Sequence, residues 1–211
     1  MEPEKRDFNL EAATWDEKPQ RVQLANDVSN AILAEIPFDG RMKVLDFGCG
    51  TGLITLRIRP RVYSITGVDT SDGMLKVLKD KVNKQDLTNV KTHLLDPERG
   101  GLPDGPYDAI VSSMTLHHIN DIATWLVRFH DLLVPGGRIA LADLDPDGGL
   151  FHEDNQGVFH NGFDRETIRW ALERAGFTDI RDRTAAEVVK PSSDGGNRKF
   201  TVFLLVGRKK V

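Results

Sequence analysis

The sequence contains very little cysteine. Cys49 is the only one among 211 residues, so no disulfide can form within the chain. This usage fits a reducing cytosol, and we expect a cytoplasmic protein. Basic residues are not in excess either, since 28 Lys and Arg stand against 32 Asp and Glu. Nucleic-acid binding requires clustered positive charge to neutralise phosphates, so we do not expect a nucleic-acid partner.

Long apolar runs are also missing. None approaches the about 20 residues that a membrane helix requires. Residues 1–18 are acidic and polar, unlike a secretory signal. We find no internal repeat and no low-complexity linker. With 39% apolar residues the chain can fill a core, so we expect one soluble domain over residues 1–211 and no membrane partner.

Short apolar runs alternate with amphipathic stretches along the first two thirds of the chain. Helical spacing appears at 18–36, and Pro37 marks its end. The five apolar runs, which are nearly continuous, are residues 42–47, 63–68, 90–95, 107–112 and 138–144. Strands of this kind are buried on both faces, which favours a doubly wound, largely parallel sheet covered by helices.

The end of the chain has another pattern. A helix capped by Asp164 is followed by strand-like runs at 177–189 and 199–206. The stretch 191–197 between them is short and rich in turn residues, so the two strands should pair as an antiparallel hairpin.

The strongest motif is the loop Gly48-Cys49-Gly50-Thr51-Gly52, which follows a strand and opens a helix. Glycine lets the backbone approach a ligand closely, and the amides of a helix N-terminus favour a carboxylate or phosphate. Asp46 just before the loop would repel a phosphate, but it would attract an ammonium. A dinucleotide fingerprint would require Gly or Ala where Leu53 stands.

Two further carboxylates end strands. Asp69 ends the second strand, where a carboxylate accepts hydrogen bonds from ribose hydroxyls; a helix-start role is the alternative. Asp96 ends the third strand, where it would accept from an adenine amino group, although a turn before Pro97 explains it almost as well. We expect Met74 either to pack against an adenine ring or to lie in the core on the apolar face of its helix.

Histidines follow the fourth strand. His117 and His118 are candidates for a general base or for holding an acceptor, with helix-start or core positions as the alternative. His152 lies in the acidic loop beyond the fifth strand, and it is a third candidate. That loop begins with Asp143-Leu-Asp-Pro-Asp-Gly148, a weak match to a calcium loop. Cys49 lacks an identifiable base, which argues against a nucleophile.

Together, these motifs resemble the class I S-adenosylmethionine-dependent methyltransferases, and they are most similar to the ubiquinone/menaquinone-biosynthesis group. The resemblance rests on the glycine loop, Asp69, Asp96, the run from Tyr107 to His118 and the Leu133-Val-Pro-Gly-Gly-Arg turn. It covers residues 20–206 and implies a Rossmann-like α/β fold. The implied seven-stranded sheet has the order 3-2-1-4-5-7-6, mostly parallel with the C-terminal antiparallel hairpin and with helices on both faces.

The resemblance also implies a site. Asp46 and the glycines would surround the methionine part of S-adenosylmethionine, Asp69 would hold the ribose and Asp96 the adenine, and a loop at 112–114 would close over the cofactor. An N-terminal segment around Trp15 and Lys18, within residues 1–20, would form part of a lid, although a helix packed on the core explains Trp15 equally. The residues expected to contact the cofactor are Asp46, Gly48, Cys49, Gly50, Gly52, Asp69, Thr70, Met74, Asp96, Ser112 and Met114.

The expected activity is methyl transfer to an acceptor that the sequence does not identify. The acidic charge favours a small molecule. The candidate catalytic residues are His117, His118 and His152, and we predict no metal ligand. An NAD(P)-binding oxidoreductase or a non-catalytic cofactor-binding protein on the same fold is the alternative. The sequence does not indicate an oligomeric state.

Overall fold

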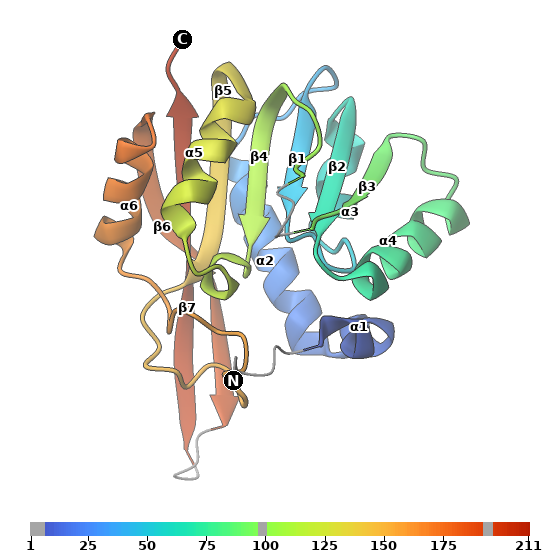
Figure 1. Ribbon diagram of the computed structural model, residues 1–211. Coiled ribbons are helices and arrows are strands. Elements are labelled where there is room, and N and C mark those ends of the chain that lie inside the picture. The colour runs from blue at the N-terminus through green and yellow to red at the C-terminus, as the bar shows by residue number, and fades with distance from the viewer. Residues whose placement is uncertain (1–6, 97–100, 192–195) are drawn as a thin grey trace.

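The computed structural model describes residues 7–96, 101–191 and 196–211. Seven strands form one sheet in the order β3-β2-β1-β4-β5-β7-β6 (Figure 1), which confirms the expected order. The strands are β1 Lys43–Phe47, β2 Ser64–Asp69, β3 Val90–Leu94, β4 Tyr107–Ser113, β5 Leu133–Leu144, β6 Phe177–Pro191 and β7 Asn197–Lys209. The first five pair in parallel, and β7 pairs antiparallel with both β5 and β6.

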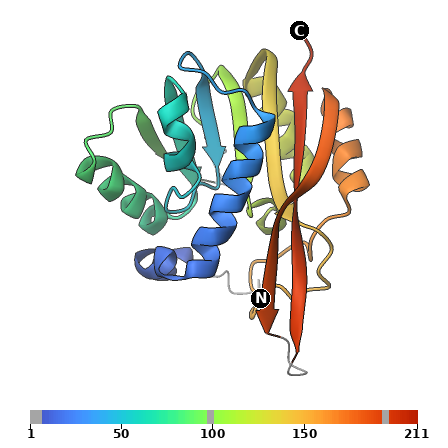
Figure 2. The same ribbon diagram turned by 180° about the vertical axis from the view of Figure 1, so that it is seen from behind.

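Helices cover both faces of the sheet. They are α1 Phe8–Glu11, η1 Ala12–Glu17, α2 Pro19–Glu35, α3 Thr55–Ile58, η2 Arg59–Arg61, α4 Asp72–Lys84, η3 Leu116–His118, α5 Ile122–Leu132 and α6 Arg165–Arg174. Figure 1 shows α5 and α6 on one face, and Figure 2 shows α2 and α3 on the other. Within the described residues, no helix combines the length and the apolar character needed to cross a membrane.

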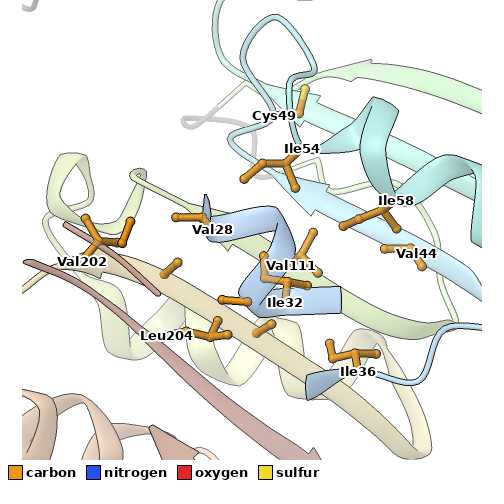
Figure 3. Packing of buried hydrophobic residues seen from close by; sticks show 14 of the residues in the cluster. Val28, Ile32, Ile36, Val44, Cys49, Ile54, Ile58, Val111, Val202 and Leu204 are labelled. Carbon is orange, nitrogen blue, oxygen red and sulfur yellow. The ribbon is translucent and has the colours of Figure 1, made fainter. Parts of the chain in front are cut away.

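Each face of the sheet has its own apolar core. Val28 and Ile32 of α2 pack against alternate side chains of the central strands, such as Val44 and Val111 (Figure 3). On the opposite face, Leu126 and Phe129 of α5 pack against the other set of strand residues. Because alternate residues of a strand point to opposite faces, burial on both sides explains why these strands are nearly continuously apolar.

Local signals fix the helix starts. The Ser71 hydroxyl accepts a hydrogen bond from the Met74 amide, Asp121 accepts from Thr124, and Asp164 accepts from Thr167. These contacts cap α4, α5 and α6 and satisfy amides that a helix leaves without partners. The contact of Asp164 confirms the expected cap of α6. The strands β6 and β7 extend further than expected and run past the carboxyl ends of the parallel strands (Figure 1). Of the predicted turn between them, residues 192–195 lie outside the described residues.

Candidate functional site

The glycine loop after β1 has a backbone that only glycine adopts easily. Gly48, Gly50 and Gly52 have φ values of +72°, +53° and +83°. An added Cβ at Gly48 would lie 2.1 Å from the Thr115 hydroxyl, and one at Gly52 would lie 2.3 Å from Leu78. At Gly50 an added Cβ would meet nothing within 4 Å. Two glycines therefore allow close packing, while the backbone of Gly50 faces open space that a ligand can enter.

Asp46 supplies a buried carboxylate two residues before this loop. It lies at the end of β1, is 1% exposed, and accepts a hydrogen bond of 2.5 Å from the Thr55 hydroxyl. Burial raises the pKa of Asp46 to about 7, and the neighbouring charge of Asp69 acts in the same direction against the Thr55 bond. A cation brought to this loop would favour the charged carboxylate.

Asp69 connects two loops at the end of β2. One of its oxygens accepts from the Gly50 amide at 2.8 Å and the other from the Ser71 amide at 2.9 Å. Burial raises the pKa of Asp69, although these backbone donors oppose it. Each carboxylate oxygen has a second lone pair, so the residue holds the glycine loop in place and still has capacity to accept from a ligand.

Cys49 and Ser112 direct their side chains into the protein. The Cys49 sulfur belongs to the core beside Ile54 (Figure 3), and burial raises the pKa of its thiol well above the usual range. The Ser112 hydroxyl donates to the Phe47 carbonyl at 2.9 Å. A nucleophilic Cys49 is thereby contradicted. Any cofactor contact of Cys49 would come from its backbone.

The remaining predicted cofactor residues surround the same sheet edge. Met74 is 2% exposed in the first turn of α4, while Thr70 is exposed just before it. Met114 follows β4 with a φ of +54°, a backbone conformation that non-glycine residues adopt mainly at functional or tight positions. Asp96 is exposed after β3, where Leu95 donates to the Asp69 carbonyl at 2.8 Å. Pro97, which follows Asp96, lies outside the described residues.

The N-terminal segment formed by α1 and η1 lies against this edge. Asp16 accepts from the Thr51 hydroxyl at 2.6 Å and forms an ion pair with Lys81 of α4. Asn9 accepts from the Ser71 hydroxyl and from the Gly73 amide, both at 2.8 Å. These contacts join the segment to both the glycine loop and the start of α4. No helical periodicity marks this segment, so the bounds of the two short helices were not predicted.

Aromatic contacts complete the segment. The ring of Trp15 is half-buried, with the Arg21 guanidinium 3.6 Å from its centroid. Phe8 makes edge contacts with Trp15 and, at 5.2 Å between centroids, with His118. Lys18 is exposed at the start of α2. Trp15 thus belongs to a segment that contacts the glycine loop through Asp16 and His118 through Phe8.

The structure brings the three candidate histidines together. The ring centroids of His117 and His118 are 4.2 Å apart, and His152 lies 5.0 Å from His117 and 5.9 Å from His118. His117 is 1% exposed, and its Nδ1 lies 2.7 Å from an Asp143 oxygen. His118 Nδ1 lies 2.8 Å from the Gly157 carbonyl. Asp143 was not among the sequence candidates for this site, although an acid ending a fully apolar strand was a signal for it.

The weak calcium-loop match at residues 143–154 finds no support in the structure. Asp143 is turned toward His117, Asp145 forms an ion pair with Arg165, and Asp147 accepts from the Gly149 and Phe151 amides of its own turn. A calcium loop needs these carboxylates on one ion. Across 7–96, 101–191 and 196–211, no group of three His, Cys, Asp or Glu is arranged to hold a metal.

Comparison with known proteins adds a family match. Residues 20–181 match the model of a family described as a methyltransferase domain. The chain is 35% identical over 135 residues to an uncharacterized methyltransferase of Schizosaccharomyces pombe, a match that spans 57% of this chain and 48% of that protein. It is 28% identical over 158 residues to the malonyl-[acyl-carrier protein] O-methyltransferase of Priestia megaterium, across 71% of this chain and 53% of that protein. The chain thus spans about half the length of these curated relatives.

Solved structures share the fold. Phosphoethanolamine N-methyltransferase 2 of Haemonchus contortus, in complex with S-adenosyl-L-methionine, superposes with a TM-score of 0.72 over 98% of this chain and 60% of that chain. Its sequence identity is 16%, so the likeness concerns the fold. None of these matches is to an oxidoreductase, and the NAD(P) alternative finds no support in them.

Proposed function

This chain belongs to the methyltransferase-domain family, and from that premise we propose that it binds S-adenosylmethionine at the glycine loop and transfers its methyl group to a small-molecule acceptor. The observation that carries the proposal is the open space at Gly50, whose amide donates to the Asp69 carboxylate, with Asp46 in the strand that leads into the loop. A backbone that approaches a ligand closely, beside two acceptors for an ammonium and for hydroxyls, suits an amino-acid tail joined to a ribose.

Each residue has a separate part in this proposal. The backbone of Gly48, Gly50 and Gly52 would border the methionine part, with the charge of Asp46 attracting its ammonium. Asp69 would accept from the ribose hydroxyls and Asp96 from the adenine. When bound, the cofactor supplies a methyl group on a positively charged sulfur, which is a good leaving group. The protein then contributes mainly orientation and exclusion of water.

We further propose that α1 and η1 act as a lid. Asp16 holds η1 to Thr51 of the glycine loop and to Lys81, and Asn9 holds α1 to the start of α4. The segment would thereby cover the bound cofactor. The likeness to the ubiquinone/menaquinone-biosynthesis group stays part of the proposal, supported by the order of the motifs. The small-molecule acceptor is supported by the net charge of −4.

Three measurements test the proposal. Calorimetry with S-adenosylhomocysteine should show binding that Asp69→Ala weakens strongly. A thermal-shift assay that compares S-adenosylhomocysteine with NAD and NADP should show a higher melting temperature with S-adenosylhomocysteine only, since a ligand of the native state raises the melting temperature. In an activity assay, the tritiated methyl group of S-adenosylmethionine should be transferred to the small-molecule fraction of a cell extract. Binding without transfer to any fraction would favour the non-catalytic alternative.

A further inference from the structure

Asp143 is a buried carboxylate that the proposed function does not yet use. It is 0% exposed at the end of β5. One of its oxygens accepts from the Leu116 amide at 2.8 Å and faces the His117 amide at 3.4 Å. The other accepts from its neighbour's amide, that of Leu144, at 2.8 Å, and lies 2.7 Å from His117 Nδ1.

These contacts fix the ionisation of Asp143 and the tautomer of His117. Burial acts to raise the pKa of Asp143, but the charge and hydrogen bond of His117, with the backbone donors, hold it below its ordinary value. An ionised carboxylate only accepts hydrogen bonds, so Nδ1 of His117 carries the hydrogen. In the neutral form of this imidazole the lone pair is then on Nε2, which is buried and has no hydrogen-bond partner within the described residues.

The position of His117 relates this pair to the proposed cofactor site. It lies in η3, two residues after Thr115, whose side chain contacts Gly48 of the glycine loop. The neighbouring ring of His118 contacts Phe8 of the N-terminal segment. The loop between β5 and α6 approaches from a third side, through the His152 ring and through the amides of Phe159 and His160, which lie at 2.9 and 3.3 Å from the His117 carbonyl.

We propose that Asp143 is a positioning residue that makes Nε2 of His117 the base for an acceptor with a weakly acidic hydroxyl, such as a phenol or an enol. This inference rests on the proposed methyl transfer. The acceptor's O–H bond breaks and its proton passes to Nε2, while the oxygen's electron pair forms the new O–C bond. The methyl group leaves the sulfur, which keeps the C–S bonding pair. The positive charge thus moves from sulfur to the imidazolium, beside the Asp143 carboxylate.

The chemistry of the pair indicates the acceptor class. A carboxylic acid, with an ordinary pKa near 4, is already ionised at neutral pH and needs no base. A phenol, with a pKa of about 10, keeps its proton and does need one. An ammonium would need a carboxylate to hold it, but both oxygens of Asp143 already accept hydrogen bonds from the Leu116 and Leu144 amides, and one lies 2.7 Å from His117 Nδ1. Other titratable groups facing His117 are the imidazoles of His118 and His152.

The first test does not depend on activity. Nitrogen-15 NMR of the histidine rings in the full chain, saturated with S-adenosylhomocysteine, should show His117 as the Nδ1–H tautomer at pH 7.5 to 8 (about one unit or more above an ordinary histidine pKa). Asp143→Asn should change that tautomer ratio, and His117→Asn assigns the signals. An Nε2–H tautomer in the unchanged protein would overturn the proposal.

The second test uses tritiated S-adenosylmethionine and the small-molecule fraction of a cell extract. His117→Asn keeps a side-chain N–H donor for Asp143 but has no basic nitrogen. We expect it to lower the initial rate at least about 100-fold, the lower range of general-base contributions, with the S-adenosylhomocysteine affinity within about 3-fold. His130→Asn, in the last turn of α5, is the matched control and should retain the rate.

The chemistry of the labelled product decides the acceptor class. A methyl ether keeps its label in mild alkali and is not retained on a cation exchanger. Release of labelled methanol by alkali would identify a carboxyl acceptor, and retention on the exchanger an amine; either result overturns the inference, as does an unchanged rate in His117→Asn. Absence of transfer to every fraction would instead overturn the proposed function on which it rests.

Discussion

Replacing Asp46 by Asn should stabilise the cofactor-free protein and weaken its binding of S-adenosylhomocysteine. Asp46 is 1% exposed, and burial raises its pKa from 3.8 to about 7. The charged carboxylate is thus a destabilising feature of the empty fold at neutral pH. Asn has the same shape, keeps an oxygen that can accept from Thr55, and carries no charge.

The expected magnitude follows from the linkage between pKa and stability. Because the pKa of Asp46 is higher in the folded state, its contribution is most favourable below pH 3.8 and is lost as pH rises toward 7. Relative to the natural protein, Asp46→Asn should gain about 1.4 kcal/mol of unfolding free energy per pH unit between pH 4 and 7. The gain should level off above pH 7 at about 4 kcal/mol, an order-of-magnitude figure that follows from the pKa of about 7.

Urea unfolding of both proteins between pH 5 and 8, without cofactor, measures this difference. Calorimetry over the same range should show that S-adenosylhomocysteine affinity rises with pH in the natural protein and stays flat in Asp46→Asn. Asp39→Asn is a control of opposite sign, because Arg41 lowers the pKa of that exposed carboxylate. A stability difference between Asp46→Asn and the natural protein that does not change with pH would refute the reasoning.

Three further predictions concern the same site. Gly50→Ala should fold with a loss of about 1–2 kcal/mol of stability from its positive φ and bind S-adenosylhomocysteine at least about tenfold more weakly. Gly48→Ala should destabilise the fold more, because its methyl group meets Thr115. Thermal melts measure the loss of stability, and calorimetry measures the loss of binding. Asp16→Ala removes the acceptor of the Thr51 hydroxyl. It should weaken binding by about 1 kcal/mol, the typical value of one hydrogen bond, and speed amide exchange in residues 8–17; equal exchange would argue against a lid. Asp69→Ala leaves the Gly50 and Ser71 amides without their acceptor and should weaken binding about 100-fold, a combined loss of about 2.7 kcal/mol.

The elements that the sequence predicted best are those with strong local signals. Strands buried on both faces were recognisable from their nearly continuous apolar runs, and the predicted cap Asp164 acts within the first turn of its own helix. The sheet order followed from the family resemblance. The glycine loop was recognisable because its requirement for positive φ is a property of single residues. Whether the predicted residues bind the cofactor is still a prediction.

The N-terminal segment shows where sequence reasoning stopped. Phe8 and Trp15 give no helical period, and the segment is ordered by Asp16 reaching Thr51 and Lys81, residues that are distant in sequence. The acidic loop shows another limit of local patterns. Its carboxylates match a calcium motif weakly, and the fold directs Asp143 and Asp145 to different partners.

The sequence by itself determined the alternation of strands and helices, the glycine loop and the carboxylates at strand ends, because each depends on neighbouring residues. The tertiary structure alone decided that Asp143 of β5 lies behind His117 of η3, and that three histidines form one cluster. Parallel strands that end at one edge bring together residues that are far apart along the chain, and no local pattern encodes those pairings.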